Sequence, residues 1–349
     1  MSEAPVRVAI IGCGWAGARH ARAFAEAGAT LRWAIDLDDG RAQALRAGLR
    51  MSPDEPRTAA DYRLALADPD VDAVDVCLPH NLHAPVTIDA ARAGKHILCE
   101  KPIADTLAAA DGMIAAADEA GVVLMIAENE HFNPLYRKIR ALLDRGVIGT
   151  PALVQRTREC YLTRSFVEDR PWFLDARAAA GGMMMAGGVH DYETTRLLVG
   201  EAESVYALRA PQRFHELEGD DTSVAVVRFQ SGAVGTFVLS FVMKSLTTAS
   251  GPEVHTLRID GELGSLVVTD GKTIQLFTEA ETPFLGERLV QHDIVVPPQD
   301  TFLLEIEHFL ACVRTGEEPQ TSGRQQRRPL AFVLAAYESM ATGRPVRLC

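Results

Sequence analysis

Apolar residues are spaced in two different ways along the chain, and the change falls near residues 128–150. Before it, short apolar runs alternate with segments of helical composition, beginning with the β-branched run Val6–Ile11. Unbroken apolar runs are typical of strands that are buried on both faces. Strands are predicted at 6–11, 30–35, 72–78, 95–100 and 122–127, and helices at 19–27, 39–47, 61–66, 86–93 and 106–120. Strands that alternate with helices predict a doubly wound parallel sheet.

From residue 151 onward, apolar and polar positions alternate over longer segments. This alternation predicts strands with one buried and one solvent-facing side, as in antiparallel sheets. The segments are 152–160, 204–210, 223–230, 233–241, 256–260, 266–269, 274–278 and 289–295. Helices are predicted at 133–145, about 188–199, 301–314 and 325–341.

These patterns predict two domains. Residues 1–128 are expected to form an α/β domain with the parallel sheet. Residues 129–349 are expected to form an α+β domain with a large, open, mostly antiparallel sheet, and the tail 325–349 to pack back on the first domain. A chain of 349 residues is long enough for two such cores.

Charge and composition exclude several classes of protein. The net charge of −12 argues against nonspecific binding to nucleic acid or to an anionic membrane surface. We find neither a membrane-spanning apolar stretch nor a signal peptide, and the six cysteines are scattered without a C-x-x-C pair. The sequence therefore predicts a cytoplasmic protein with reduced thiols.

The first predicted strand runs directly into Gly12-Cys-Gly-Trp-Ala-Gly17, which has G-x-G-x-x-G spacing and opens a helix. In this context Gly12 permits a tight turn, Gly14 lets the backbone approach a pyrophosphate, and Gly17 lets the helix lie close to the strand. Free N–H groups at the start of the helix attract phosphate. The stretch predicts a Rossmann-type dinucleotide site, although an ordinary glycine-rich turn is the alternative.

Asp36 ends the second predicted strand, where an acidic side chain accepts the adenosine ribose hydroxyls. A carboxylate there repels the 2′-phosphate of NADP, so NAD is the expected cofactor. NADP stays open because Arg41 partly offsets the negative charge.

Ligands of doubly wound sheets bind beyond the carboxyl ends of the strands. The residues expected to contact the cofactor at these ends are Gly12, Gly14, Trp15, Ala16, Gly17, Asp36, Pro79, Asn81, His83, Glu100, Lys101 and Glu128. For His83, a role as the cap of the next helix is equally consistent with the pattern.

Five stretches of the chain resemble the glucose–fructose oxidoreductase / inositol dehydrogenase / rhizopine catabolism (Gfo/Idh/MocA) family. They are 8–17, 78–83, 93–102, 127–134 and 181–190, and Ala-Gly-Lys-His…Glu-Lys-Pro within 93–102 is the most specific. The resemblance spans nearly the whole chain. It implies hydride transfer between NAD(P) and a secondary alcohol or ketone of a sugar, cyclitol or sugar derivative, without a metal, by a homodimer or homotetramer.

Lys101 matches the family lysine that acts as base or proton relay at the reacting carbinol. The chemistry is consistent, since the pKa of a partly desolvated lysine can fall towards neutrality and its ammonium can stabilise an alkoxide. The resemblance also implies a cis Lys101-Pro102 bond. Without the resemblance, Lys101 is more simply interpreted as a solvated lysine at a strand end.

His190 matches the second catalytic residue of the family, but Ala186 stands where the family has aspartate. A carboxylate for the substrate is expected to come from Glu193, or else from Asp191, because Glu193 lies one helical turn from His190. The alternative is a purely structural histidine at the helix start. Further candidates for substrate contact are Tyr161 and Trp172, whose ring can stack on a sugar, although a solvated loop explains them as well.

Two other functional classes remain open from the sequence. A hydrolase or lyase that retains NAD can use transient oxidation to acidify a neighbouring carbon. A sugar or dinucleotide sensor can use the same scaffold without turnover, and Ala186 is compatible with that loss. The substrate, its reacting carbon and the direction of the reaction do not follow from the sequence.

Overall fold

The computed structural model describes residues 4–49, 56–242, 254–280 and 290–348. The chain divides into two compact units, each built from two segments. The first unit comprises residues 1–129 and 300–328, and the second comprises 130–299 and 329–349.

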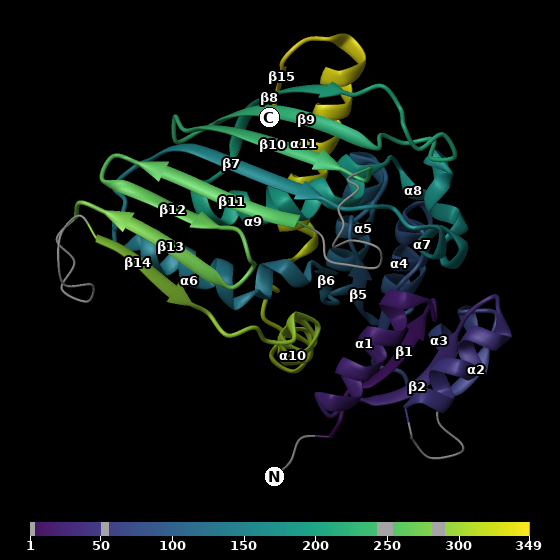
Figure 1. The fold of residues 1–349 in the computed structure, drawn as a ribbon. Helices are drawn as coiled ribbons and strands as arrows, with labels where there is room; N and C mark the ends of the chain where they lie inside the picture. Colours follow the sequence, from purple (N-terminus) through teal and green to yellow (C-terminus); the bar gives the residue numbers. More distant parts are fainter. Residues whose placement is uncertain (1–3, 50–55, 243–253, 281–289, 349) are drawn as a thin grey trace. The chain divides into compact units, whose positions relative to one another are not determined.

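The first unit contains a six-stranded parallel sheet with the order β3-β2-β1-β4-β5-β6 within the described residues (Figure 1). Its strands are β1 Arg7–Ile11, β2 Thr30–Ile35, β3 Arg57–Ala59, β4 Ala73–Val76, β5 His96–Glu100 and β6 Leu124–Ala127. The predicted doubly wound fold is therefore confirmed. Strand β3 was not predicted, because three residues at a sheet edge carry too little apolar pattern to be recognised.

Helices connect these strands and end where the sequence provides caps. They are α1 Trp15–Glu26, α2 Asp39–Gly48, α3 Arg63–Ala67, α4 His83–Arg92 and α5 Leu107–Ala120. In α5, the Thr106 hydroxyl accepts a hydrogen bond from the Ala109 N–H, and Gly121 ends the helix with a φ of 65°.

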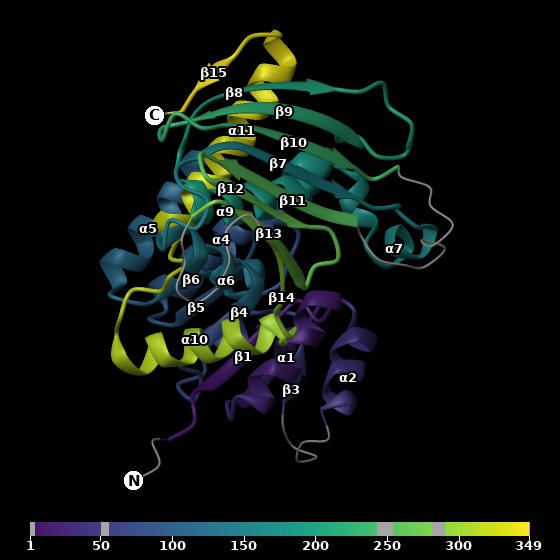
Figure 2. The ribbon, with the colours of Figure 1, turned by 60° about the vertical axis from the view of Figure 1, so that its left-hand side comes forward.

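A helix from late in the chain completes the first unit. Helix α10, Thr301–Thr315, packs along α1, where the Phe24 and Phe309 rings lie 6.2 Å apart, and Figure 2 shows the two helices side by side. The sequence pattern placed this helix in the second domain. The boundary differs because an amphipathic helix joins whichever apolar surface is open to it.

The second unit contains a nine-stranded sheet with the order β14-β13-β12-β11-β7-β10-β9-β8-β15 within the described residues. Neighbouring strands are antiparallel except for β7 and β10, which confirms the mostly antiparallel prediction. The strands are β7 Pro151–Glu159, β8 Ala202–Arg209, β9 Thr222–Phe229, β10 Val234–Ser240, β11 Val254–Gly261, β12 Gly264–Val268, β13 Thr273–Thr278, β14 Val290–Val295 and β15 Val346–Arg347. Leu289, predicted to begin β14, lies outside the described residues.

One face of this sheet carries helices, and the other is open in the unit (Figure 1). The helices are α6 Pro134–Asp144, α9 Val189–Val199 and α11 Gly323–Thr342, and Phe237 of β10 meets Phe332 of α11 at 5.6 Å. In β9, alternate residues are buried and exposed, as the sequence predicted. The last part of the tail, residues 329–349, belongs to this unit, where β15 pairs with β8.

Among the described residues, no helix is both long enough and apolar enough to cross a membrane.

Candidate functional site

The glycine loop between β1 and α1 lies where the strand order of the first unit reverses, between β1 and β4. Gly12 has a φ of 98°, and a Cβ there would overlap the carbonyl oxygen of Cys77. A Cβ on Gly17 would overlap the Gly12 carbonyl oxygen, whereas a Cβ on Gly14 would meet none of the described residues within 4 Å apart from its own neighbours in the chain. Two glycines thus permit close packing, and the third leaves open space at the helix start.

Helix α1 begins at Trp15 with no side-chain cap hydrogen bond at Gly14, and the amino end of a helix attracts phosphate through its dipole. Trp15 is half exposed and lies against Arg19, whose guanidinium carbon is 4.1 Å from the ring centroid. Ala16 follows in the first turn. These features fit the diphosphate of a dinucleotide.

Asp36 follows β2 directly and connects it to the loop. Its Oδ2 accepts a hydrogen bond from the Cys13 N–H (2.8 Å), and its Oδ1 accepts one from the Asp38 N–H (2.9 Å). The side chain stays partly exposed, and its carboxylate has acceptor sites left for ribose hydroxyls. The residues present therefore fit NAD.

The turn after β4 holds three predicted contacts in different environments. Pro79 and Asn81 lie at the surface around the turn His80–Leu82. His83 is fully buried, and its Nδ1 and Nε2 lie 2.8 Å from the carbonyl oxygens of Pro102 and Leu78. Burial lowers the pKa of His83. The geometry favours a brace between two backbone segments over a cofactor contact.

Lys101 is half-buried at the end of β5, and its peptide bond to Pro102 is cis, as the resemblance implied. The Lys101 backbone N–H donates to Oε2 of Glu100 (2.9 Å). Glu128, just beyond β6, is fully buried, so a direct contact with a ligand is not favoured in this conformation.

Behind Glu100 lies a buried group of ionisable side chains that the sequence analysis missed. We call it the carboxylate cluster: His20, Asp75, Cys77, Glu100 and Glu305. The sequence did contain a signal for this cluster, namely Asp75 in the middle of the apolar strand 72–78. A buried charge is too costly to occur without a partner, so a partner could have been expected.

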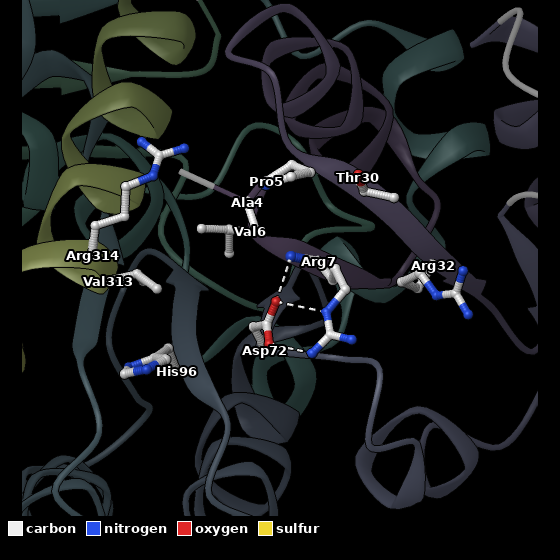
Figure 3. A pocket seen from close by; sticks show the side chains of 10 residues that line it. All are labelled: Ala4, Pro5, Val6, Arg7, Thr30, Arg32, Asp72, His96, Val313 and Arg314. Carbon is white, nitrogen blue, oxygen red and sulfur yellow. Dashed lines mark hydrogen bonds and ion pairs between the residues drawn. The ribbon is translucent and has the colours of Figure 1, made fainter. Parts of the chain in front are cut away.

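A pocket of about 510 Å³ opens at the amino ends of the strands of the six-stranded sheet, opposite to the end that carries the glycine loop. Figure 3 shows its lining by residues from the amino ends of the strands, with Arg7 turned toward Asp72. None of the predicted site residues lines it, so we do not assign the cofactor to this pocket.

In the second unit, His190 is the second residue of α9, which follows one π-helical turn, Met184–Gly188. Ala186 and His190 are both partly exposed, whereas Gly187 and Gly188 are buried. His190 is therefore accessible to a small molecule in this unit.

The expectation that Glu193 contacts the substrate does not fit the structure. Glu193 is fully buried, with Oε1 accepting from Nδ1 of His131 (2.9 Å) and Oε2 accepting from Nε of Arg196 (2.9 Å). The alternative, Asp191, is also fully buried and is paired with two arginines. Helical spacing predicts which side chains share a face of α9, but it does not predict which face is buried in the folded unit.

The arginines that hold Asp191 come from β7. Arg156 Nε donates to Asp191 Oδ1 (2.8 Å), and Arg158 Nε donates to Oδ2 (3.0 Å). Arg158 also donates to Glu130 (3.3 Å), and Arg156 to the Tyr136 hydroxyl (2.6 Å). We call these five residues the arginine cluster. Two arginines on the buried side of an alternating strand were the signal that sequence analysis missed.

Tyr161 and Trp172 lie in the segment that links β7 to the π-helical turn. Tyr161 is 41% exposed. Trp172, in the turn Pro171–Leu174, is partly exposed and meets the buried Phe173 edge-on at 5.7 Å. Both rings present surface that a sugar can stack against.

Comparisons with known proteins agree with this arrangement. Residues 6–128 match the model of an oxidoreductase family with an NAD-binding Rossmann fold, and residues 136–267 match the GFO/IDH/MocA C-terminal domain. The chain is 28% identical over 348 residues to myo-inositol 2-dehydrogenase of Thermotoga maritima, covering 98% of each protein. It is 32% identical over 287 residues to 1,5-anhydro-D-fructose reductase of Ensifer adhaerens, covering 81% of each.

Among solved structures, the WlbA dehydrogenase from Bordetella pertussis in complex with NADH and UDP-GlcNAcA is similar, with a TM-score of 0.86 and 26% identity over 99% of each chain. The glycine loop, the acidic residue after β2 and both family models indicate the same family. The chain belongs to the Gfo/Idh/MocA family of NAD(P)-dependent oxidoreductases.

Proposed function

We propose that this protein transfers hydride between NAD(P) and a secondary alcohol or ketone of a sugar, cyclitol or sugar derivative. Lys101 is the proposed proton donor or acceptor, and His190 assists it. The observation that carries the proposal is the position of Lys101 at the end of β5, two strands from the glycine loop in a parallel sheet. The names of the relatives, which include inositol, xylose and levoglucosan dehydrogenases, support the substrate class.

The loop residues Gly12, Gly14 and Gly17 would hold the diphosphate, together with the first N–H groups of α1 at Trp15 and Ala16. Asp36 would hold the adenosine ribose and favours NAD. NAD supplies a hydride acceptor when it is bound.

In the oxidation, the neutral amine of Lys101 takes the hydroxyl proton as hydride leaves the carbinol carbon. In the reduction, the Lys101 ammonium returns this proton to the developing alkoxide. Atoms and charge balance in both directions without a metal. The half-buried position of Lys101 supports this role, because partial desolvation favours the neutral amine.

His190 is proposed to hydrogen-bond the reacting hydroxyl. Tyr161 and Trp172 are proposed to contact the sugar through their exposed rings. With Glu193 and Asp191 buried in ion pairs, no carboxylate is assigned to the substrate from helix α9.

The test follows reduced nicotinamide by absorbance. NAD and NADP are each offered with myo-inositol, D-xylose and levoglucosan, and NADH and NADPH with 1,5-anhydro-D-fructose. We expect a change with at least one polyol or ketone and a preference for NAD. Lys101→Met should then lower kcat by about 10²–10⁴-fold while binding of NAD persists. Lys138→Met, at an exposed position of α6, is the control.

Two outcomes would contradict the proposal. Cofactor that stays bound while a glycoside is cleaved without net absorbance change would indicate the hydrolase or lyase. Binding of sugar and NAD without turnover in either direction would indicate the sensor.

We further propose a homo-oligomer formed through the open face of the second sheet. Leu208, Val224, Val226 and Val234 of β8, β9 and β10 are each at least 39% exposed. Contiguous exposed apolar side chains are typical of interfaces. Light scattering at micromolar concentration should give a dimer or tetramer, and Val226→Glu should shift it toward the monomer. A monomeric mass for the unaltered protein would contradict the proposal.

A further inference from the structure

The backbone around Lys101 is held at two points by side chains of the first unit. On one side, the Lys101 N–H donates to Oε2 of Glu100 (2.9 Å). On the other, the Pro102 carbonyl oxygen lies 2.8 Å from Nδ1 of the buried His83. The Glu100 carboxylate therefore helps to hold the backbone from which the Lys101 side chain extends.

Glu100 is itself in contact with a fully buried histidine. His20 Nε2 lies 3.4 Å from Oε1 of Glu100, and His20 Nδ1 lies 3.1 Å from both oxygens of Asp75. The hydrogen bonds to Asp75 use Nδ1, whereas Nε2 has no hydrogen-bond partner among the described residues and lies at ion-pair distance from Glu100. Only the imidazolium form presents a positive charge to both carboxylates. The geometry thus matches a buried cation between two carboxylates.

A third carboxyl group faces the same histidine from α10. Glu305 Oε1 lies 3.8 Å from His20 Nε2, and neither oxygen of this fully buried side chain has a hydrogen-bond partner among the residues that the structure describes. One cation does not balance three carboxylates away from water, so one carboxyl group keeps its proton. Burial, with Glu100, Glu128 and Asp75 nearby, raises the pKa of Glu305 well above its usual value. Glu305 is the neutral member.

We propose that His20 is a positioning residue for the reaction: as an imidazolium fixed by Asp75, it keeps Glu100 ionised and oriented to hold the Lys101 backbone. This inference rests on the proposed function of Lys101. In this role His20 contacts neither cofactor nor substrate and acts only through Glu100.

The charges around His20 support the imidazolium. Burial by itself lowers the pKa of His20, but the Asp75 carboxylate outweighs this effect and raises it well above its usual value. Cys77 Sγ lies 3.6 Å from His20 Nδ1 and donates to Asp75 at 3.4 Å. The other facing groups are Glu100 on β5, Glu305 on α10 and the Phe302 ring at 5.6 Å.

The test is a double-mutant cycle on the full-length protein with His20→Gln, Glu100→Ala and the double variant. The steady-state kcat and KM are measured from pH 6 to pH 10, and the NAD dissociation constant by calorimetry. We expect each single variant to lower kcat by about tenfold or more, because small misplacements of a reacting group slow catalysis. The NAD dissociation constant of His20→Gln should change by less than about threefold, and the double variant should be no slower than the slower single variant.

The pH dependence separates positioning from a structural effect. Without the imidazolium, Glu100 ionises only at higher pH, so kcat of His20→Gln relative to wild type should recover as pH rises. Glu100→Ala should show no recovery. Phe24→Leu, in the same α1–α10 layer, is the control, because it weakens packing without touching the cluster.

Three results would overturn the inference. They are additive losses in the double variant, a loss in His20→Gln that does not change with pH, and a stoichiometric metal ion in the purified protein. The third is included because His20, Asp75 and Cys77 place ligand atoms within 4.8 Å of one another, and a metal on Nδ1 would exclude the imidazolium. Failure of the proposed function is distinguishable, because the unaltered protein would then show no net hydride transfer, or Lys101→Met would keep full turnover.

Discussion

The carboxylate cluster of the first unit and the arginine cluster of the second are both buried and ionisable, but their charges are balanced differently. In the arginine cluster, Arg156 and Arg158 face Asp191 and Glu130, and each pair is joined by hydrogen bonds of 2.8–3.3 Å. In the carboxylate cluster, a single histidine faces several carboxyl groups. The first arrangement is neutral with both arginines and both carboxylates ionised. The second has one imidazolium for three carboxyl groups, so a retained proton reduces its excess negative charge.

This difference gives the two clusters opposite responses to pH. Burial raises the pKa of Asp191, but Arg158 and Arg156 outweigh it and lower this pKa well below its usual value. The stabilisation that ionised Asp191 contributes is present above the pKa of this carboxyl in the unfolded chain. It is lost as pH falls through the lower pKa of the folded protein. The pKa values of His20 and Glu305 are raised, so their contributions are lost as pH rises. Acid should weaken the second unit and alkali the first.

The largest expected effect comes from breaking the balanced cluster. Asp191→Ala leaves two buried guanidinium groups without their main partner, and we expect unfolding free energy to fall by about 3–5 kcal/mol. Urea denaturation at pH 7 measures it. The control is Asp260→Ala, which removes an Arg258 pair on the solvent side of β11 and should cost about 0–1 kcal/mol. Equal losses of unfolding free energy for both variants would show that burial does not determine how much an ion pair contributes to stability.

The next effect tests the retained proton of the carboxylate cluster. Glu305→Gln mimics a neutral carboxyl group, so its stability should match wild type near pH 5. Wild type should then lose about 1.4 kcal/mol per pH unit relative to the variant as pH rises, because the unfolded chain ionises first. Thermal melts from pH 5 to pH 9 measure the slope, with the exposed Glu307→Gln as the control. Parallel curves for Glu305→Gln and wild type would mean that Glu305 is ionised when folded.

The smallest effect concerns the edge of the arginine cluster. Glu130 has 18% of its side chain exposed and accepts a hydrogen bond from Arg158 (3.3 Å). Glu130→Gln should cost about 1–2 kcal/mol at pH 7, because Asp191 still holds Arg158. The pKa of Glu130 is lowered: burial opposes ionisation, and Arg158 outweighs it. The difference from wild type should therefore shrink in acid, and a difference that grows in acid would contradict this sign.

Sequence analysis located most strands, most helices and the glycine loop, because each depends on local spacing. Gly12, Gly14 and Gly17 specify a backbone shape within six residues. It failed where the answer depends on distant partners. Glu193 was expected to face a substrate. In the structure it lies in the core, where it pairs with His131, 62 residues earlier in the chain. His20 and Glu305 were not recognised, because they are separated by most of the chain.

The sequence alone determined the parallel and antiparallel sheets, the family and the cofactor class, since periodicity and contiguous motifs encode them. Only the tertiary structure decided that α10 returns to the first unit and brings a third carboxyl group to His20. It also decided which carboxylates of α9 are covered by the arginines of β7. The physical reason is the same in both cases: the charge and exposure of an ionisable side chain depend on the groups that folding places around it.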